Sequence, residues 1–185
     1  MIDFFVMDKV AQLLYDGEVV ALFQGRSESG ARALGNRSIL FNPTIEGMND
    51  YVNQIKGREK FRPLAATVLS ERGSLFFDYW PIDESPYMLY AVNVNRSRVA
   101  GNQLPAVTHV DGTCRIQTVT EKQNPFYYKL IEKYYKLSDM PLVGNTSLNL
   151  AGEPLAETLD DALDVVNRSE IKYLYLPERR KLIIN

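Results

Sequence analysis

The sequence contains very little cysteine and histidine. Cys114 and His109 are the single members of their types among 185 residues. One cysteine excludes a disulfide within the chain and is typical of a reducing compartment. One histidine excludes a zinc or iron site built from several His and Cys ligands of this chain, so we expect no transition metal bound by its own side chains.

The chain also lacks an excess of positive charge and a long apolar run. Its formal net charge is −2 and its pI is about 5.5, whereas proteins dedicated to DNA or RNA usually carry a basic excess. No stretch is long enough to span a bilayer. Met1 to Lys9 places acidic residues in an apolar stretch, without the basic start of a signal peptide. We expect a soluble, cytoplasmic protein with no membrane partner, for which nucleic acid is a poor candidate.

The apolar content that is present fits one globular domain, residues 1–185. Hydrophobic residues make up 45% of the chain and charged residues 24%, enough to bury a core. Helical spacing of apolar residues predicts helices over 6–14, 48–55, 127–134 and 159–166. We expect strands at 19–23, 39–41, 64–69, 88–94, 113–119 and 142–145, then a terminal hairpin of 171–176 and 182–184. Polar loops are expected at 24–38 and 97–105. This order predicts an α/β (α+β) fold, a mixed sheet flanked by helices.

Local signals mark several ends of these elements. Gly17 is expected to stop the first helix. Asn124 followed by Pro125 predicts a helix N-cap and first turn. Thr158 with Asp161 resembles a capping box, and Asp111-Gly112 is a turn signal before the strand that starts at Thr113.

The loop after the first strand is rich in glycine and arginine. Gly25, Gly30 and Gly35 alternate with Arg26, Arg32 and Arg37. Glycine lets a backbone approach a ligand closely, and guanidinium groups pair with phosphate oxygens. The spacing is not that of a Walker A loop or of a G-x-G-x-x-G loop. An anion cradle and a surface loop with solvated arginines are equally good interpretations of these residues alone.

A second basic segment follows the helix that ends near Gly57. Lys56, Arg58, Lys60 and Arg62 alternate, so in an extended segment they would share one face and need an anion between them. From Gly25 to Pro63, seven basic residues stand against four acidic ones, a local charge of +3 in a chain of net −2. Such segregation favours a site for a negative ligand. Cations favoured at a helix C-terminus are the alternative, which explains Arg62 poorly.

Two further segments carry polar groups beside strands. Arg115 lies in a strand with mostly uncharged neighbours, so it either pairs with a buried carboxylate or faces a ligand. Nearby His109 is expected to be structural and Cys114 to pack as a small hydrophobe. The segment from Gly144 to Pro154 ends a strand with amide and hydroxyl side chains, which is typical of ligand crevices and also of ordinary Asn/Ser turns.

Together, the four segments resemble one family. Glu28 to Leu40 matches Glu-Phe-Gly-Pro-Arg-Ala-Leu-Gly-Asn-Arg-Ser-Ile-Leu, with Ser29 for Phe and Ala31 for Pro. Lys56 to Pro63 matches Lys-x-Arg-Glu-x-Phe-Arg-Pro, and His109 to Arg115 matches His-Val-Asp-Gly-Thr-x-Arg. Asn145 to Pro154 matches Asn-Thr-Ser-x-Asn-x-x-Gly-Glu-Pro. The chain is similar to the C-terminal, YrdC-like domain of NodU/CmcH-type O-carbamoyltransferases.

This resemblance implies a function and a partner. Such a domain uses ATP and carbamoyl phosphate to form carbamoyl-adenylate, with Mg²⁺ bound mostly through the phosphates. A separate N-terminal-type transferase domain or subunit, with a His-ligated iron, moves the carbamoyl group to a hydroxyl acceptor. The resemblance implies catalytic roles for Lys56, Arg62, Arg115 and Ser147. The implied ligand-binding residues are Arg32, Arg37, Lys56, Arg58, Arg62, Arg115, Asn145, Thr146, Ser147 and Asn149.

Three alternatives remain open from the sequence. One is a standalone YrdC-like module that binds nucleotide or RNA without turnover. Another is an enzyme acting on a different carbamate, such as a threonylcarbamoyl-adenylate synthase. The third is a decayed relic, against which the presence of all the matched polar residues argues.

Overall fold

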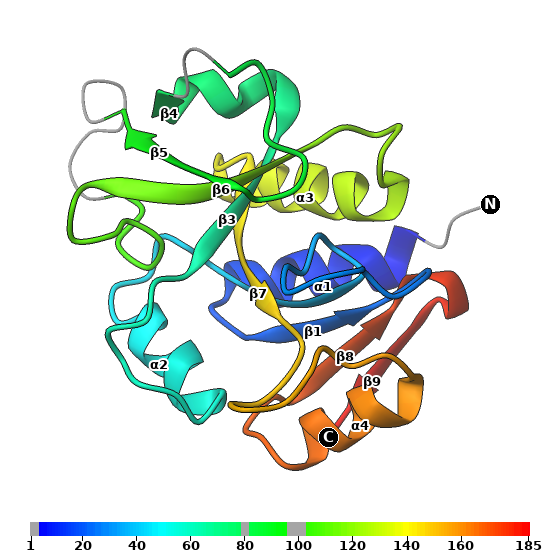
Figure 1. Ribbon diagram of the computed structural model, residues 1–185. Helices are drawn as coiled ribbons and strands as arrows, with labels where there is room; N and C mark the ends of the chain where they lie inside the picture. The colour runs from blue at the N-terminus through cyan, green and yellow to red at the C-terminus, as the bar shows by residue number, and fades with distance from the viewer. Residues whose placement is uncertain (1–3, 79–81, 96–102) are drawn as a thin grey trace.

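A computed structural model describes residues 4–78, 82–95 and 103–185. In this part of the chain, a nine-stranded sheet is covered by helices (Figure 1). The helices are α1 (Phe4–Tyr15), α2 (Met48–Ile55), α3 (Pro125–Ser138) and α4 (Leu159–Asn167), with 3-10 turns η1 (Ser70–Leu75) and η2 (Pro177–Arg179). The strands are β1 (Val20–Phe23), β2 (Arg37–Phe41), β3 (Ala65–Leu69), β4 (Phe77–Asp78), β5 (Tyr90–Val94), β6 (Thr113–Val119), β7 (Leu142–Ser147), β8 (Tyr173–Leu176) and β9 (Lys181–Ile184).

The sheet is mixed, as the sequence predicts. Its strand order is β4-β5-β6-β3-β7-β2-β1-β8-β9. The pairs β1–β8 and β3–β6 are parallel, and the other neighbouring pairs are antiparallel. Strand β7 lies between β2, which follows the glycine-arginine loop, and β3, which follows the basic segment. The centre of the sheet therefore gathers the sequence segments that carry polar residues.

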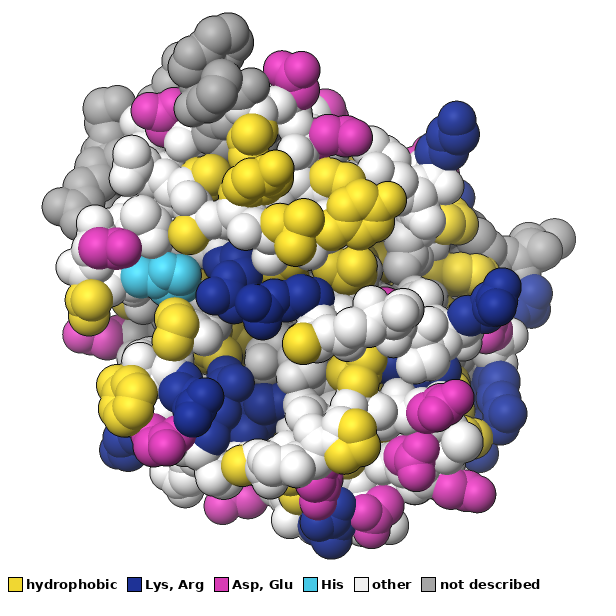
Figure 2. Space-filling view, in the orientation of Figure 1, with side chains coloured by type: hydrophobic (Ala, Val, Ile, Leu, Met, Phe, Trp, Pro, Cys, Tyr) yellow, Lys and Arg dark blue, Asp and Glu magenta, His cyan; other side chains and the backbone are white. Residues whose placement is uncertain are grey.

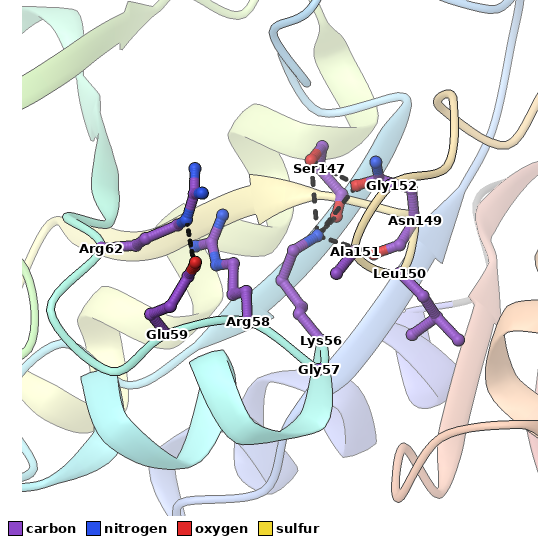
Figure 3. A pocket seen from close by; sticks show the side chains of 10 residues that line it. All are labelled: Lys56, Gly57, Arg58, Glu59, Arg62, Ser147, Asn149, Leu150, Ala151 and Gly152. Carbon is purple, nitrogen blue, oxygen red and sulfur yellow. Dashed lines mark hydrogen bonds and ion pairs between the residues drawn. The ribbon is translucent and has the colours of Figure 1, made fainter.

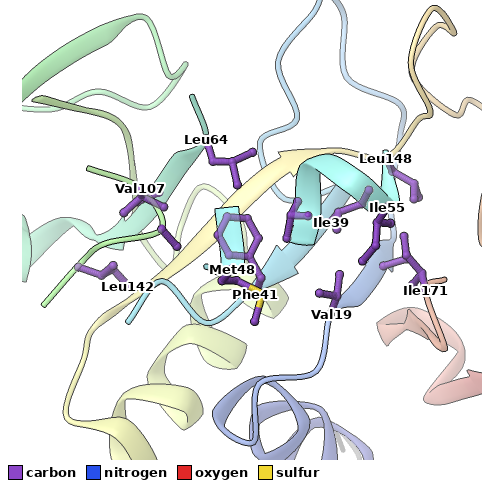
Figure 4. Packing of buried hydrophobic residues seen from close by; sticks show 14 of the residues in the cluster. Val19, Ile39, Phe41, Met48, Ile55, Leu64, Val107, Leu142, Leu148 and Ile171 are labelled. Atoms are coloured by element: carbon purple, nitrogen blue, oxygen red, sulfur yellow. The ribbon is translucent and has the colours of Figure 1, made fainter. Parts of the chain in front are cut away.

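Helices pack on both faces of the central strands, where successive side chains point to opposite faces. In β2, Leu40 packs with α1 and α3, whereas Ile39 and Phe41 pack on the other face with α2 (Figure 4). Gly144 of β7 lies opposite Phe41, and a Cβ at that position would overlap the Phe41 ring. The glycine thus lets a large aromatic ring lie against the central strand.

The local end signals are confirmed. Asn124 accepts a hydrogen bond from the backbone N–H of Tyr127 at 3.2 Å and caps α3. Thr158 and Asp161 form a reciprocal capping box at the start of α4. Gly17 follows α1 with φ +91°, and Leu176 and Lys181 close the terminal β8–β9 hairpin around η2.

Several boundaries differ from the prediction for physical reasons. β2 begins two residues early, at Arg37, because the side chain of Arg37 is buried against backbone carbonyls and not solvated. β5 begins at Tyr90, since Met88 has φ 55° and cannot continue a strand. β7 extends to Ser147 because it pairs with Ser38 of β2. The short β4 and the turns η1 and η2 were not expected. Part of the predicted loop 97–105 lies outside the described residues.

No helix in the described ranges is long and apolar enough to cross a membrane.

Gly35 gives a prediction about the loop before β2. It has φ +104°, and an added Cβ would overlap the ring of Tyr127. Gly30 has a similar φ of +108°, but nothing lies within 4 Å of its would-be Cβ. Gly30→Ala should therefore lower the free energy of unfolding by about 1–2 kcal/mol through backbone strain alone. Gly35→Ala should lower it by roughly 1–3 kcal/mol more, through overpacking.

Urea unfolding of both variants would measure the difference, with equal slopes indicating the same unfolded state. Equal losses of stability in the two variants would show that the Tyr127 ring does not restrict Gly35.

Candidate functional site

The basic segment and the amide-hydroxyl segment face each other across one pocket of about 600 Å³. We call it the large pocket (Figure 3). It is lined by Lys56, Gly57, Arg58, Glu59, Arg62, Ser147, Asn149, Leu150, Ala151 and Gly152. The first five come from the segment after α2, and the others are Ser147, which ends β7, and residues that follow it. Two segments about ninety residues apart in the chain thus form one concave surface.

Lys56 is buried on one side of the large pocket, with 2% of its surface exposed. Its ammonium donates to the carbonyl of Ser147, to the carbonyl of Asn149 at 2.8 Å and to Asn149 Oδ1 at 2.9 Å. Burial, with the nearby charge of Arg58, lowers the pKa of Lys56 to about 7. The neutral oxygens orient the amine, and a bound anion would favour its charged form.

Asn53 holds the basic segment in place through its side-chain hydrogen bonds. It is fully buried in α2. Its amide nitrogen donates to the carbonyls of Lys60 at 3.0 Å and Arg62 at 2.9 Å, and its oxygen accepts from Arg58 Nε at 2.5 Å. Sequence reasoning missed Asn53, because an asparagine in an amphipathic helix gives no signal that it bonds to a later turn.

Arg58 has a guanidinium nitrogen that is buried and, within the described part of the chain, unpartnered. This nitrogen is Nη2, while Nε bonds to Asn53. Burial, and then the charge of Arg62, lower the pKa of Arg58. A buried donor without an acceptor is costly, so this side chain is suited to receive an anionic oxygen.

Arg62 and Glu59 form an exposed ion pair at the mouth of the large pocket. Arg62 Nε donates to Glu59 Oε2 at 2.6 Å, and about half of each side chain is exposed. The bond raises the pKa of Arg62 and lowers that of Glu59. Sequence reasoning named Arg62 as a candidate but assigned no role to Glu59.

A second, smaller pocket of about 80 Å³ adjoins the first. We call it the small pocket. It is lined by Ala31, Arg32, Ala33, Arg58, Pro63, Leu64, Ala65, Met88, Arg115, Asn145, Thr146 and Ser147. Arg58 and Ser147 line both pockets, so the two are adjacent. Burial, and then the charge of Arg32, lower the pKa of Arg115. Figure 2 shows two groups of Lys and Arg side chains on this face, with a hollow between them.

Arg37 occupies a different place from the other candidate arginines. It is 3% exposed, and its guanidinium lies 3.7 Å from the centre of the Phe23 ring. It donates to the carbonyls of Gln24 at 2.6 Å, Asn36 at 3.0 Å and Glu157 at 3.0 Å. Arg37 lines neither pocket and ties the glycine-arginine loop to the segment before α4.

Glu28 folds that loop back on itself. Its carboxylate accepts three backbone N–H groups, from Leu34 at 2.9 Å, Asn36 at 2.6 Å and Arg37 at 3.0 Å. Burial raises the pKa of Glu28, although these bonds favour its anion. These hydrogen bonds close a loop between Glu28 and Leu34, and Arg32 lies within that loop. Glu28 was also missed, since its partners are backbone groups that no motif reveals.

A buried amide network holds the other end of the loop. Asn145 is fully buried and donates to the carbonyl of Ala33 at 3.1 Å and to Thr67 Oγ1 at 3.0 Å. Gln117 donates to the carbonyl of Leu34 at 2.9 Å and accepts from Thr67 at 2.8 Å. Of the candidate amide and hydroxyl residues, Asn145 lines the small pocket but is fully buried. Thr146, Ser147 and Asn149 are partly exposed at the pocket walls.

His109 and Cys114 lie where structural residues are expected. His109 contacts the carbonyl of Leu64 at 3.0 Å through Nε2 and Thr113 Oγ1 at 3.1 Å through Nδ1. Cys114 is fully buried, and burial raises the pKa of its thiol to about 12, which makes it a poor nucleophile. Among the described residues, no group of three or more His, Cys, Asp or Glu side chains is arranged to hold a metal.

The two pockets together have a strong excess of positive charge. Lys56, Arg58, Arg62, Arg32 and Arg115 line them, and Glu59 is the one carboxylate among their described lining residues. Preorganised cations of this kind bind phosphates and stabilise charge that develops on transferring groups. The arrangement is suited to two anionic ligands side by side.

The fold has known counterparts. The full-length HypF structure in its phosphate- and nucleotide-bound form superposes with a TM-score of 0.63 at 20% identity, covering 88% of this chain and 23% of HypF. Pyrococcus abyssi Sua5 complexed with L-threonine gives a TM-score of 0.61 at 15% identity, covering 92% of this chain and 46% of Sua5. These similarities confirm the expected YrdC-like mixed sheet flanked by helices.

Sequence relatives are much more similar. Nodulation protein NolO of Bradyrhizobium diazoefficiens is 41% identical, over 85% of this chain and 29% of its own length. The 3'-hydroxymethylcephem-O-carbamoyltransferase of Amycolatopsis lactamdurans is 39% identical, over 83% of this chain and 28% of its own length. The chain thus spans less than a third of the length of these curated relatives.

Residues 11–181 match the family described as carbamoyltransferase C-terminus. The match covers all four segments from which the resemblance was inferred, and it confirms that inference. The pockets described above are formed within the matched residues. This chain therefore belongs to the carbamoyltransferase C-terminal domain family.

Proposed function

We propose that this domain binds ATP and carbamoyl phosphate and forms carbamoyl-adenylate, which a separate transferase domain or subunit uses on a hydroxyl acceptor. The observation that carries the proposal is the excess of positive charge in two adjoining pockets, whose lining includes five cationic side chains and one carboxylate. Membership of the carbamoyltransferase C-terminal family and the HypF-like fold support it.

The two pockets suggest how the ligands divide. The large pocket, about 600 Å³, lies within the range of nucleotide and cofactor sites. There Lys56 and Arg62 would hold the triphosphate, while Arg32 and Arg115 would hold the smaller anionic group in the small pocket. Arg58 lies between them and would contact the reacting phosphate.

The reaction needs alignment and charge neutralisation more than a protein nucleophile. Water releases phosphate from carbamoyl phosphate and leaves carbamate. A carbamate oxygen then attacks the α-phosphorus of ATP, the bond to the β-phosphate oxygen breaks, and pyrophosphate leaves with its electron pair. Arginine and lysine side chains that neutralise the α-, β- and γ-oxygens lower the barrier to this step.

Ser147 and Asn149 would act mainly by orienting Lys56. The Ser147 hydroxyl donates to Asn149 Oδ1 at 2.6 Å, and both residues accept from the Lys56 ammonium. Thr146, one residue earlier, presents a hydroxyl at the wall of the small pocket. Mg²⁺ bound through the phosphates would supply further neutralisation of the triphosphate.

Pyrophosphate release tests the proposal. The purified chain incubated with ATP, Mg²⁺ and carbamoyl phosphate should release pyrophosphate and yield carbamoyl-adenylate, detectable by mass spectrometry. Lys56→Ala and Arg62→Ala each remove a charged hydrogen-bond donor to the ligand. Each should weaken ATP binding about tenfold to a hundredfold and reduce turnover at least as much.

Lys136→Ala is the matched control, because Lys136 pairs with Glu132 on the exposed surface of α3. It removes the same charge without touching either pocket, so its ATP affinity should equal that of the wild type. Pyrophosphate release that requires threonine and bicarbonate would instead support a threonylcarbamoyl-adenylate synthase. The absence of both turnover and ATP binding would overturn the proposal.

The buried amine of Lys56 predicts a pH dependence of binding. Its pKa is about 7 in the free protein, and a bound polyphosphate raises the pKa because it stabilises the ammonium. At about pH 8 the free amine is mostly neutral, so binding must take up close to one proton. The affinity for ATP should therefore fall as the pH rises above about 7.

Calorimetric titration at about pH 8, in buffers of different ionisation enthalpy, would count the protons taken up. Lys56→Arg keeps a positive charge at every accessible pH, so its binding should show no such uptake. Equal proton uptake by the wild type and Lys56→Arg would assign it to a group other than Lys56.

A further inference from the structure

Glu59 is an anomaly in a pocket otherwise suited to an anion. Of the described residues that line the large pocket, it alone carries a negative charge. It lies between two of the cations in the sequence, contacts Arg62 at 2.6 Å, and is stabilised as an anion by Arg62 and Arg58 (Figure 3). A free polyphosphate entering this pocket would meet a carboxylate that repels it and that already occupies Arg62.

A divalent cation bound to the polyphosphate turns its repulsion by the Glu59 carboxylate into attraction. Mg²⁺ is coordinated by oxygen atoms, keeps several of its waters, and is bound in proteins through one or two carboxylates together with substrate phosphates. Glu59 fits the role of such a carboxylate, since about half of its side chain is exposed at the pocket mouth. Its single carboxylate would contact a cation that the phosphates bring and hold.

We propose that Glu59 makes the large pocket select a polyphosphate that carries a divalent cation over the metal-free polyphosphate. This inference rests on the proposed function, because it assigns the metal-bound form of the triphosphate as the ligand. Glu59 then has two partners in turn. It holds Arg62 in the free protein, and it contacts the cation or its waters when the ligand is bound, which releases Arg62 to a phosphate oxygen.

Asp50 provides a matched comparison within the same part of the fold. Its carboxylate pairs with Lys60 at 3.6 Å, and both side chains are about as exposed as those of the Glu59–Arg62 pair. Asp50 does not line either pocket. Asp50→Asn thus removes the same charge from the neighbourhood of the pocket without removing a group that faces the ligand.

Calorimetric titration with inorganic tripolyphosphate, in excess Mg²⁺ and in EDTA, tests the selection without any turnover. The quantity measured is the ratio of the two affinities for wild type, Glu59→Gln and Asp50→Asn. Glu59→Gln should tighten binding of the metal-free form and lower the preference for the magnesium form about five- to tenfold. Asp50→Asn should keep the wild-type preference.

Three results separate the possible failures. An unchanged preference in Glu59→Gln would overturn the role of Glu59 while leaving the anion site intact. An equal change in Asp50→Asn would also overturn it, because the effect would then come from the general field of the surface. A wild-type protein that binds neither form would overturn the triphosphate site on which the proposed function depends. Thermal melting of the variants checks that each remains folded, as expected for an exposed ion pair.

Discussion

Five cationic side chains converge on two adjoining pockets, and neutral oxygen atoms hold two of them, Lys56 and Arg58, in place. Lys56 is held by carbonyls of Ser147 and Asn149, and Arg58 by the amide of Asn53. Carbonyl and amide dipoles orient a cation without cancelling its charge. The field of the group therefore remains directed at the pocket, where a paired carboxylate would have cancelled it. The architecture around the site is organised to keep these dipoles in place.

The central strand β7 supplies much of that organisation. Its carboxyl end carries the oxygens that receive Lys56, while Asn145 in its middle reaches beneath the glycine-arginine loop. Gly144 in the same strand makes room for Phe41 and so lets the sheet pack tightly under the site. Because β7 is buried from Leu142 to Asn145, the packing around these residues restricts their movement when a ligand arrives. The cations are thus positioned before binding, which is what electrostatic catalysis requires.

The sequence predicted the elements well where the signal is local. Asn124 at a helix start and Thr158 with Asp161 act within a few residues, and the structure has the caps they predict. The polar partners were harder, because Asn53 and Glu28 bond to backbone groups whose position depends on the fold. Arg37 illustrates the same limit, since its burial depends on Phe23 and on a carbonyl of Glu157, 120 residues away. Residue type indicates which side chains are cationic. Only the tertiary contacts distinguish the cations that line a pocket from a cation such as Arg37, which holds the surrounding loop.

The hydrogen bonds of Glu28 also determine which part of the glycine-arginine loop is held in place. The three N–H groups that it binds lie at Leu34, Asn36 and Arg37, so the loop closes at its base and not at its tip. Ser29 and Ala31, which stand where the family pattern has Phe and Pro, are both exposed, and Gly30 between them has open space around it. The hydrogen bonds of Glu28 therefore fix the base of the loop, whereas Ala31, which also lines the small pocket, lies in the part that they do not hold directly.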